Sequence, residues 1–454
     1  MNSKSINPAT GELIAEFPEC TDAMLEEKLA ATSAAFASWK DEPVAARARC
    51  MSALASLLKK RAPQLGALAT AEMGKPITQA VAEVEKCAWV CDYYATKAAA
   101  MLAPRTIDSD AKKSYIRFDP LGPILAVMPW NFPFWQVFRF AAPALIAGNT
   151  GVLKHASNVS QCALAIESLF TEAGFPPGVF QTLLISAPRV EKVLRDPRVV
   201  AVTLTGSEVA GRSVASIAGD EVKKSLLELG GSDPFIILAD ADAELVMQQA
   251  VMARLQNNGQ SCISAKRYII EKTRVDEFTE LLVRAFEKLV IGDPMDVATQ
   301  IGPLVNERGV LDMERQVNES VARGARVVTG GKRLERPGFF FAPTILADVK
   351  PGMPAYDEEV FGPVLAIISA ENADEAVRIA NNTRFGLGAS LWTADIEKAE
   401  ILASRIEAGG VFINGMVKSD PRLPFGGVKK SGYGRELSDL GLHEFVNAKT
   451  VWIR

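Results

Sequence analysis

The feature that most constrains the fold is an alternation of short apolar runs with helical segments, which begins near Leu121. The apolar runs are Ile124–Met128, Thr150–Leu153, Phe180–Leu184, Val199–Leu204 and Lys223–Leu227. Between them, Pro133–Ala147 and Ser160–Ala173 carry a helical pattern of apolar residues. Alternation on this scale predicts an α/β fold with a parallel sheet that helices cover on both faces.

A second stretch of the same kind follows. Its expected strands are Phe235–Leu238, Tyr268–Glu271, Arg326–Val328, Val364–Ile368 and Val411–Asn414, and its expected helices are Val275–Leu289, Asp374–Asn381 and Ile396–Ile406. No internal repeat, low-complexity tract or long linker separates the two stretches, so we expect one compact body.

The first hundred residues are expected to be helical. Thr21 is a candidate N-cap for a helix that buries Leu25, Leu29, Phe36 and Trp39. Pro63 fits the first turn of a further helix.

Composition excludes several classes of function. The formal charge of -4, from 50 basic and 54 acidic residues, gives no electrostatic case for nucleic acid or an anionic membrane. The longest apolar runs are too short to span a bilayer. The first residues lack the apolar core of a signal peptide, so the cysteines are expected to be reduced thiols in the cytoplasm. His155 and His443 are too far apart in sequence to favour a histidine metal site.

Three side chains could carry chemistry. Cys262 ends the polar loop 257–262, where exposure and nearby backbone N–H groups would lower its thiol pKa, although a lone cysteine is more often a small buried hydrophobe. Glu228 lies between apolar residues before two glycines, where desolvation would raise its pKa towards that of a general base; the alternative is a paired structural carboxylate. Asn131 follows an apolar strand and can donate to an oxyanion, unless it merely belongs to a proline-bounded turn.

A weaker signal lies at Gly206-Ser207, between an expected strand and an expected helix. Glycine at a helix N-terminus lets a phosphate approach the backbone N–H groups. The segment matches neither Gly-x-Gly-x-x-Gly nor a P-loop, so alone it indicates little.

Together these residues resemble the aldehyde dehydrogenase superfamily along the whole chain. Further matching motifs are Asn7-Pro8-Ala9-Thr10-Gly11, Glu358-Glu359-Val360-Phe361-Gly362-Pro363, Pro424-Phe425-Gly426-Gly427 and Tyr433-Gly434-Arg435-Glu436. The resemblance implies a Rossmann-like cofactor-binding domain (1–110 and 121–230), an α/β catalytic domain (231–430) and a β-rich oligomerisation flap (111–120 and 436–454) of a homodimer or homotetramer. Within the flap, Ser114–Phe118 and Val446–Ile453 are β-rich by sequence, and ordinary surface hairpins are the alternative.

The resemblance also implies roles for individual residues. Cys262 would be the nucleophile, Glu228 the base and Asn131 the oxyanion donor. The implied cofactor contacts are Trp130, Lys154, Ser157, Gly206, Ser207, Glu359 and Phe361. The thiolate would attack an aldehyde, hydride would pass to a nicotinamide, and water activated by Glu228 would hydrolyse the resulting thioester. Relatives that transfer the acyl group to coenzyme A typically lack this glutamate, so a free acid is the expected product.

The choice of cofactor is expected to depend on Ser157. NAD-preferring relatives usually carry a glutamate three residues after the lysine that matches Lys154. A carboxylate there would repel a 2′-phosphate, whereas serine can hydrogen-bond one and Lys154 adds positive charge. We expect use of either NAD or NADP, with some preference for NADP.

The choice of substrate is expected to depend on Arg139, which shares a helical face with Trp135 in an otherwise apolar segment. A guanidinium there needs an anionic partner, either an internal carboxylate or a carboxylate of the substrate. Because bacterial succinate-semialdehyde dehydrogenases resemble this chain in having the arginine, we expect that substrate, with Ser419 and Phe425 as further contacts. The chain departs from the pattern at Gln256, where many such enzymes have a second arginine, and at Ile263-Ser264, which excludes a known redox-switch disulfide. The alternatives are glutarate semialdehyde, neutral aldehydes, or a cofactor-binding protein without activity.

Overall fold

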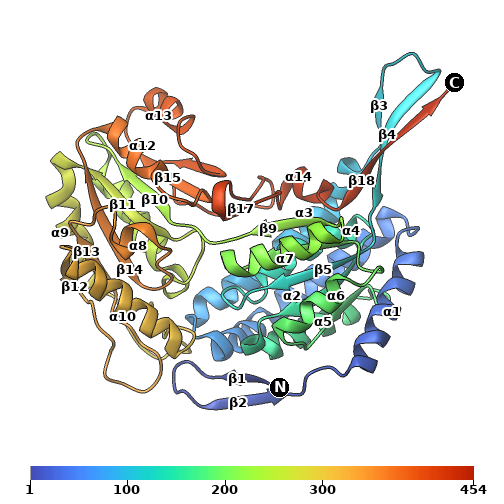
Figure 1. The fold of residues 1–454 in the computed structure, drawn as a ribbon, viewed down its shortest axis with the longest axis horizontal. Coiled ribbons are helices and arrows are strands. Elements are labelled where there is room, and N and C mark those ends of the chain that lie inside the picture. Colours follow the sequence, from blue (N-terminus) through green and yellow to red (C-terminus); the bar gives the residue numbers. More distant parts are fainter. Residues whose placement is uncertain (1) are drawn as a thin grey trace.

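The protein is built from two large sheets flanked by helices, from which a narrow β-arm projects (Figure 1). The computed structural model describes residues 2–454; residue 1, the start of the expected range 1–110, lies outside it. Within the described residues, no helix is both long enough and apolar enough to cross a membrane.

The first large sheet has the strand order β17-β9-β8-β5-β6-β7. Its strands are β5 (Pro123–Met128), β6 (Thr150–His155), β7 (Phe180–Thr182), β8 (Ala201–Thr205), β9 (Lys224–Glu228) and β17 (Gly432–Tyr433). Strands β5 to β9 pair in parallel, which confirms the five expected strands and their direction. Only β17 is antiparallel, and it brings a segment from near the C-terminus to the edge of the sheet beside β9.

Helices cover both faces of this sheet, as the alternation predicted. One face packs on α2 (Val44–Met73), α3 (Ile77–Met101), α4 (Trp135–Ile146) and α5 (Ser160–Glu172). The other face packs on α1 (Asp22–Trp39), α6 (Val190–Leu194) and α7 (Glu208–Asp220). These two apolar layers hold the carboxyl edge of the sheet, where strand ends meet helix starts, in a rigid position.

The N-terminal region differs from the expectation in two places. Residues expected to be helical form a hairpin of β1 (Ser3–Ile6) and β2 (Leu13–Phe17) before α1 begins. The expected helix start at Pro63 was wrong, because α2 continues through that residue. Proline removes one helical hydrogen bond, but the buried apolar residues on both sides of Pro63 keep the helix packed against α3. The predicted N-cap is confirmed, since Thr21 Oγ1 accepts a hydrogen bond from Met24 N at 3.2 Å.

The second large sheet has the order β12-β13-β14-β11-β10-β15-β16 and only β12 is antiparallel. Its strands are β10 (Asp233–Ile237), β11 (Ala265–Glu271), β12 (Arg326–Thr329), β13 (Thr344–Ala347), β14 (Val364–Ala370), β15 (Gly388–Trp392) and β16 (Gly410–Ile413). Its helices are α8 (Ala243–Leu255), α9 (Val275–Phe286), α10 (Glu307–Ala322), α11 (Pro354–Asp357), α12 (Ala373–Asn381) and α13 (Ile396–Ala403). Strands β13 and β15 were not predicted; β15 begins with small residues that carry little strand signal.

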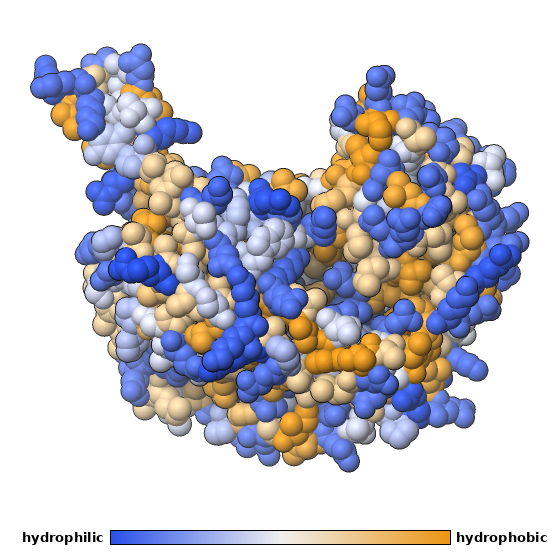
Figure 2. Space-filling model, turned by 180° about the vertical axis from the view of Figure 1, so that it is seen from behind, coloured by the Kyte–Doolittle hydropathy of each residue, from blue (hydrophilic) through white to orange (hydrophobic). Residues whose placement is uncertain are grey.

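The arm is a three-stranded antiparallel sheet of β18 (Val446–Ile453), β4 (Lys113–Pro120) and β3 (Arg105–Ile107), and α14 (Ser438–His443) precedes β18. Figure 2 shows it standing clear of the body, with apolar side chains among polar ones. Ile107, Trp452 and Ile453 are 40%, 50% and 43% exposed. The two β-rich segments of the sequence therefore pair with each other, and β3, which falls in the range 1–110, joins them.

Candidate active site

The loop that carries Cys262 is held by two asparagines that precede it. Asn257 and Asn258 have φ angles of 57°, the left-handed region that asparagine tolerates better than most residues. The Asn257 amide donates to Asn131 O at 2.7 Å and to Gln260 O at 2.9 Å. The Asn258 amide donates to the carbonyls of Gly74 and Pro303. Side-chain bonds to three other segments thus fix a strained backbone, an arrangement typical of functional loops.

A close backbone contact joins this loop to a second functional loop. Gly259 has a φ of 75°, and a Cβ there would lie 2.4 Å from Gly362 O. Only glycine permits this approach, which sets Glu359 and Phe361 beside the cysteine loop.

Cys262 lies where two cavities meet. One cavity, of about 230 Å³, is lined by Pro129, Trp130, Asn131, Gln136, Thr205, Gly206, Ser207, Leu229, Gly230, Cys262, Glu359 and Phe361. The other, of about 280 Å³, is lined by Gln79, Ala82, Glu83, Lys86, Phe132, Trp135, Gln136, Arg139, Met252, Gln256, Ser261, Cys262, Ile263, Ser419 and Phe425. We call the first the nucleotide-side cavity and the second the aldehyde-side cavity. Only Gln136 and Cys262 line both, so the thiol can contact molecules that enter from either side.

The expectation of a lowered thiol pKa at Cys262 was wrong. Burial raises the pKa of this thiol to about 12, and the positive charges of Arg139 and Lys266 reduce the shift only in part. Lys266 is held beside the loop, because its Nζ donates hydrogen bonds to the carbonyls of Ser261 and Cys262. At rest Cys262 therefore carries a thiol, which would have to lose its proton before the sulfur could act as a nucleophile.

Glu228 ends β9 and is only 2% exposed. Within the described residues neither carboxylate oxygen has a hydrogen-bond partner, and the nearest cation, Arg139 Nη2, is 4.0 Å from Oε2. Burial raises the pKa of Glu228 to about 8, while Arg139 opposes the shift. The predicted direction is confirmed, and the value suits a general base near neutral pH.

Asn131 lies just past β5 and is 4% exposed. Its Nδ2 donates to Gln260 O at 3.2 Å, which uses one of the two amide hydrogens. The second hydrogen remains for an acceptor in the nucleotide-side cavity, where Asn131 and Cys262 are both part of the lining. This placement fits an oxyanion donor.

Arg139 has an internal partner, which was the alternative left open by the sequence. Its guanidinium forms a buried ion pair with Glu436, and Nη2 donates to Thr205 Oγ1 at 3.3 Å. The guanidinium carbon also lies 4.6 Å from the centroid of the Phe425 ring. Arg139 therefore lines the aldehyde-side cavity with a carboxyl partner of its own, although burial raises the pKa of Glu436 and Arg139 only opposes that shift.

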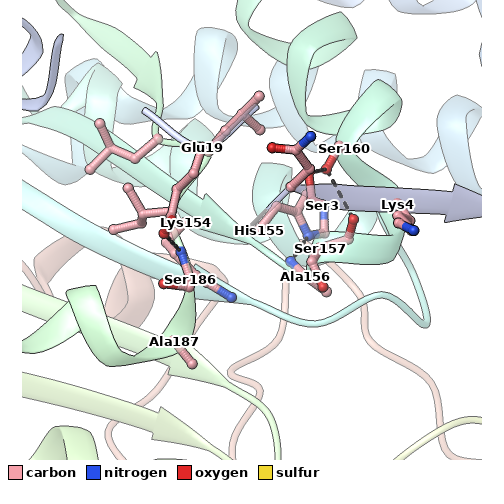
Figure 3. Close-up of a pocket in the computed structure, with 14 residues that line it drawn as sticks. Ser3, Lys4, Glu19, Lys154, His155, Ala156, Ser157, Ser160, Ser186 and Ala187 are labelled. Atoms are coloured by element: carbon pink, nitrogen blue, oxygen red, sulfur yellow. Dashed lines mark hydrogen bonds between the residues drawn. The ribbon is translucent and has the colours of Figure 1, made fainter. Parts of the chain in front are cut away.

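A third cavity, of about 390 Å³, lies at the carboxyl end of β6 and contains Lys154 and Ser157 (Figure 3). Ser157 is exposed, and burial lowers the pKa of Lys154, which has no acidic partner among residues 2–454. The sequence analysis missed Ser3 and Lys4 from β1, and Glu19 and Ser186, which also line this cavity. No sequence signal connects the first residues with this edge of the sheet; only the folded hairpin brings them there.

Between these cavities, Gly206 and Ser207 precede the start of α7, as expected. Ser207 caps that helix, since its Oγ accepts a hydrogen bond from Ala210 N at 3.3 Å. A Cβ on Gly206 would meet only Leu204 Cδ2, at 3.6 Å, so the backbone is open to a ligand. The helix N-terminus and the nearby Lys154 favour anionic groups, so the residues present fit a dinucleotide with its pyrophosphate at α7.

Glu359 and Phe361 complete the nucleotide-side cavity. Gly231 N donates to Glu359 Oε1 at 3.0 Å, and Lys266 Nζ lies 3.6 Å from the same oxygen. The rings of Trp130 and Phe361 meet edge to face at 5.8 Å. Five of the expected cofactor contacts line this cavity, namely Trp130, Gly206, Ser207, Glu359 and Phe361. The other two, Lys154 and Ser157, line the cavity at the end of β6, and Lys266 was not foreseen.

The last expected substrate contacts, Trp135 and Ser419, meet a lysine that the sequence analysis did not single out. Lys86 Nζ donates to Ser419 Oγ at 2.7 Å and lies 4.3 Å from the centroid of the Trp135 ring. In the sequence, Lys86 is one more charged residue in an amphipathic helix, and nothing local distinguishes it.

Comparison with known proteins gives a consistent picture. The sequence model described as the aldehyde dehydrogenase family matches residues 1–451. A probable NADP⁺ succinate-semialdehyde dehydrogenase of Synechocystis is 53% identical over 449 residues, which cover 99% of each chain. Succinate-semialdehyde dehydrogenase [NADP⁺] 1 of Mycobacterium tuberculosis is 52% identical over 452 residues, also 99% of each. The crystal structure of the Streptococcus pyogenes succinic semialdehyde dehydrogenase in complex with NADP⁺ has a TM-score of 0.98 at 40% identity and covers 99% of both chains.

Proposed function

Since the chain belongs to the aldehyde dehydrogenase family, we propose that it oxidises succinate semialdehyde to succinate with NADP⁺ as its preferred cofactor. The observation that carries the proposal is the position of Cys262, at the junction of the nucleotide-side and aldehyde-side cavities. The names of relatives more than half identical to this chain support the same substrate and cofactor.

In the proposed reaction, the Cys262 thiol gives its proton to solvent and Sγ adds to the aldehyde carbon, while Asn131 Nδ2 donates a hydrogen bond to the aldehyde oxygen as it gains negative charge. When bound, a nicotinamide would supply the acceptor for the hydride of this carbon. The acyl group is then held by Cys262 as a thioester. Glu228 takes a proton from the attacking water, the carbon–sulfur bond breaks to release the acid, and the Cys262 sulfur regains a proton.

Use of NADP⁺ is supported by the cavity in Figure 3. Lys154 and Ser157 offer a positive charge and a hydroxyl to a 2′-phosphate, and no carboxylate occupies position 157. Glu19 lines the same cavity, but Arg189 Nη1 lies 3.8 Å from its Oε1 and so reduces the effect of its negative charge. NAD⁺ would use the same site without the phosphate contacts and bind less well.

A substrate and cofactor panel tests this proposal. We expect kcat/KM for succinate semialdehyde to be higher than kcat/KM for glutarate semialdehyde. It should also be at least about tenfold higher than kcat/KM for butanal, because butanal lacks the carboxylate and a desolvated charge-assisted contact contributes that much. We also expect NADP⁺ to be preferred to NAD⁺. Absorbance of the reduced nicotinamide measures both, and Cys262→Ala is the inactive control. A preference for butanal, or a hundredfold bias towards NAD⁺, would contradict the proposal.

We further propose that the arm of β3, β4 and β18 joins copies of this chain into a homodimer or homotetramer. Its exposed apolar side chains and its projection from the body support this role. In this arrangement, residues 111–120 and 436–454 form the oligomerisation segments, and the two large sheets form the cofactor-binding and catalytic domains.

A reducing compartment, the cytoplasm, is the proposed location. All six cysteines are free thiols, including Cys87 and Cys91 on one face of α3. An enzyme that depends on the thiol of Cys262 keeps it reduced in such a compartment.

A further inference from the structure

We propose that Lys86 binds the distal carboxylate of the substrate and thereby determines the preference for a charged aldehyde over a neutral one. This inference rests on the proposed function, and it names the residue that makes the enzyme specific for an aldehyde with a carboxylate. It assigns to α3, which precedes the catalytic residues in the chain, a direct part in substrate recognition.

The position of Lys86 is the first support. Its side chain is part of the lining of the aldehyde-side cavity, as is Cys262. Its Nζ is held by the Ser419 hydroxyl at 2.7 Å and lies 4.3 Å from the centroid of the Trp135 ring. A lysine ammonium has three hydrogens, so two remain for a ligand. The ammonium and the Ser419 hydroxyl together offer donors to a carboxylate.

The pairing of the surrounding charges is the second support. Arg139 forms its ion pair with Glu436. Glu83 forms a buried ion pair with Lys75 and also accepts hydrogen bonds from Phe134 N and Trp135 N at the start of α4.

The same holds next to Ser419 in the chain, where Asp420 is paired with Arg422 at 2.6 Å. Lys86, by contrast, has no ion-pair partner among residues 2–454. An anion that enters the aldehyde-side cavity therefore meets Lys86 as a cation without an ion-pair partner.

The third support comes from Gln256 and Gln136, which line this cavity with neutral amides and so bring no positive charge to it. Lys86 supplies a positive charge from another element, since α3 packs closely against α4. A partly desolvated cation binds a carboxylate more strongly than one in water, provided that hydrogen bonds orient it.

Replacement of Lys86 tests the inference. We expect Lys86→Met to lower kcat/KM for succinate semialdehyde by about 10- to 100-fold, mainly through KM, because a charge-assisted hydrogen bond is lost. We expect kcat/KM for butanal to change by less than about threefold, which also shows that the variant is folded. Lys97→Met, an exposed lysine of the same helix, is the matched control and should change neither value.

A pH series separates a charge effect from a structural one. Burial lowers the pKa of Lys86 to about 8, and the charged or titratable groups that face it are Glu83 and Cys87 on α3, Arg139 on α4 and Asp420 on the loop before Phe425. We expect the ratio of kcat/KM for succinate semialdehyde to that for butanal to fall as the pH rises through about 8, since Lys86 loses its proton. Titration of Glu228 and Cys262 affects both substrates and cancels in the ratio. In Lys86→Arg the preference should persist and the ratio should stay flat, because arginine keeps its proton.

The outcomes distinguish the inference from the proposed function. Wild-type enzyme that shows no preference for succinate semialdehyde refutes the proposed function. A wild-type preference that survives in Lys86→Met refutes the role of Lys86. Selective loss of the preference in Arg139→Gln, with Lys86→Met unaffected, assigns the carboxylate to Arg139 instead.

Discussion

At the scale of single residues, burial decides the chemistry. Cys262 and Glu228 both have raised pKa values, to about 12 and about 8, and desolvation is the main cause for each. The consequences are opposite. A raised pKa leaves Cys262, the proposed nucleophile, protonated at rest, whereas it brings Glu228, the proposed base, into the range where it can both take and release a proton.

The pH dependence of turnover follows from Glu228. Only the ionised carboxylate can deprotonate water, and the ionised fraction grows with pH, so kcat should rise as the pH passes through about 8.

In Glu228→Gln we expect steady-state turnover to fall by about 10²- to 10⁴-fold while the initial burst of reduced cofactor remains. Stopped-flow absorbance measures the burst and the steady state together. Loss of the burst would mean that Glu228 acts before hydride transfer.

At the scale of elements, the site depends on loops that contact each other through their backbones. The loop of Asn257 to Cys262 approaches the loop of Glu359 to Phe361 at Gly259, where there is no room for a Cβ. Neither loop belongs to a sheet or a long helix, and asparagine side chains and this glycine contact hold them together.

Replacement of that glycine should therefore disturb catalysis as well as stability. In Gly259→Ala the added Cβ would meet Gly362 O at 2.4 Å and the φ of 75° would be strained, so we expect a stability loss of about 1–3 kcal/mol. We expect kcat to fall by about 100-fold, because small displacements of reacting groups have effects of that size. Gly219→Ala, in α7 with open space around it, is the control and should preserve both. Thermal unfolding and steady-state kinetics make the comparison, and wild-type kinetics in Gly259→Ala would contradict it.

At the scale of the whole molecule, the arm is the part that the body does not need for its own core. Trp452 and Ile453 belong to none of the four buried apolar clusters. Both side chains are at least two-fifths exposed, on a sheet that projects into solvent (Figures 1 and 2). Exposed apolar strands of this kind favour pairing with another copy of the chain.

Charge placed on the arm should weaken assembly without unfolding the body. We expect Trp452→Asp to shift the solution mass, measured by light scattering, from an oligomer towards a single chain of 48.9 kDa. Val297→Asp, at an apolar side chain of the body that is 75% exposed, should leave the mass unchanged. An unchanged mass in Trp452→Asp would exclude the arm as the main interface.

The sequence by itself indicated most of the elements and the candidate residues of the proposed reaction. Periodicity indicated the parallel strands β5 to β9, because burial on two faces demands apolar runs there, and motif spacing indicated Cys262, Glu228 and Asn131. The hairpin β1–β2, the continuous α2 and the strands β13 and β15 were not predicted from the sequence, since packing overrides weak local preferences.

Only the tertiary structure decided which charges are paired. Arg139 forms an ion pair with Glu436 from near the C-terminus, and Lys86 has no ion-pair partner among residues 2–454. Ion pairing and desolvation depend on which distant segments meet in the fold, and local sequence carries no record of that.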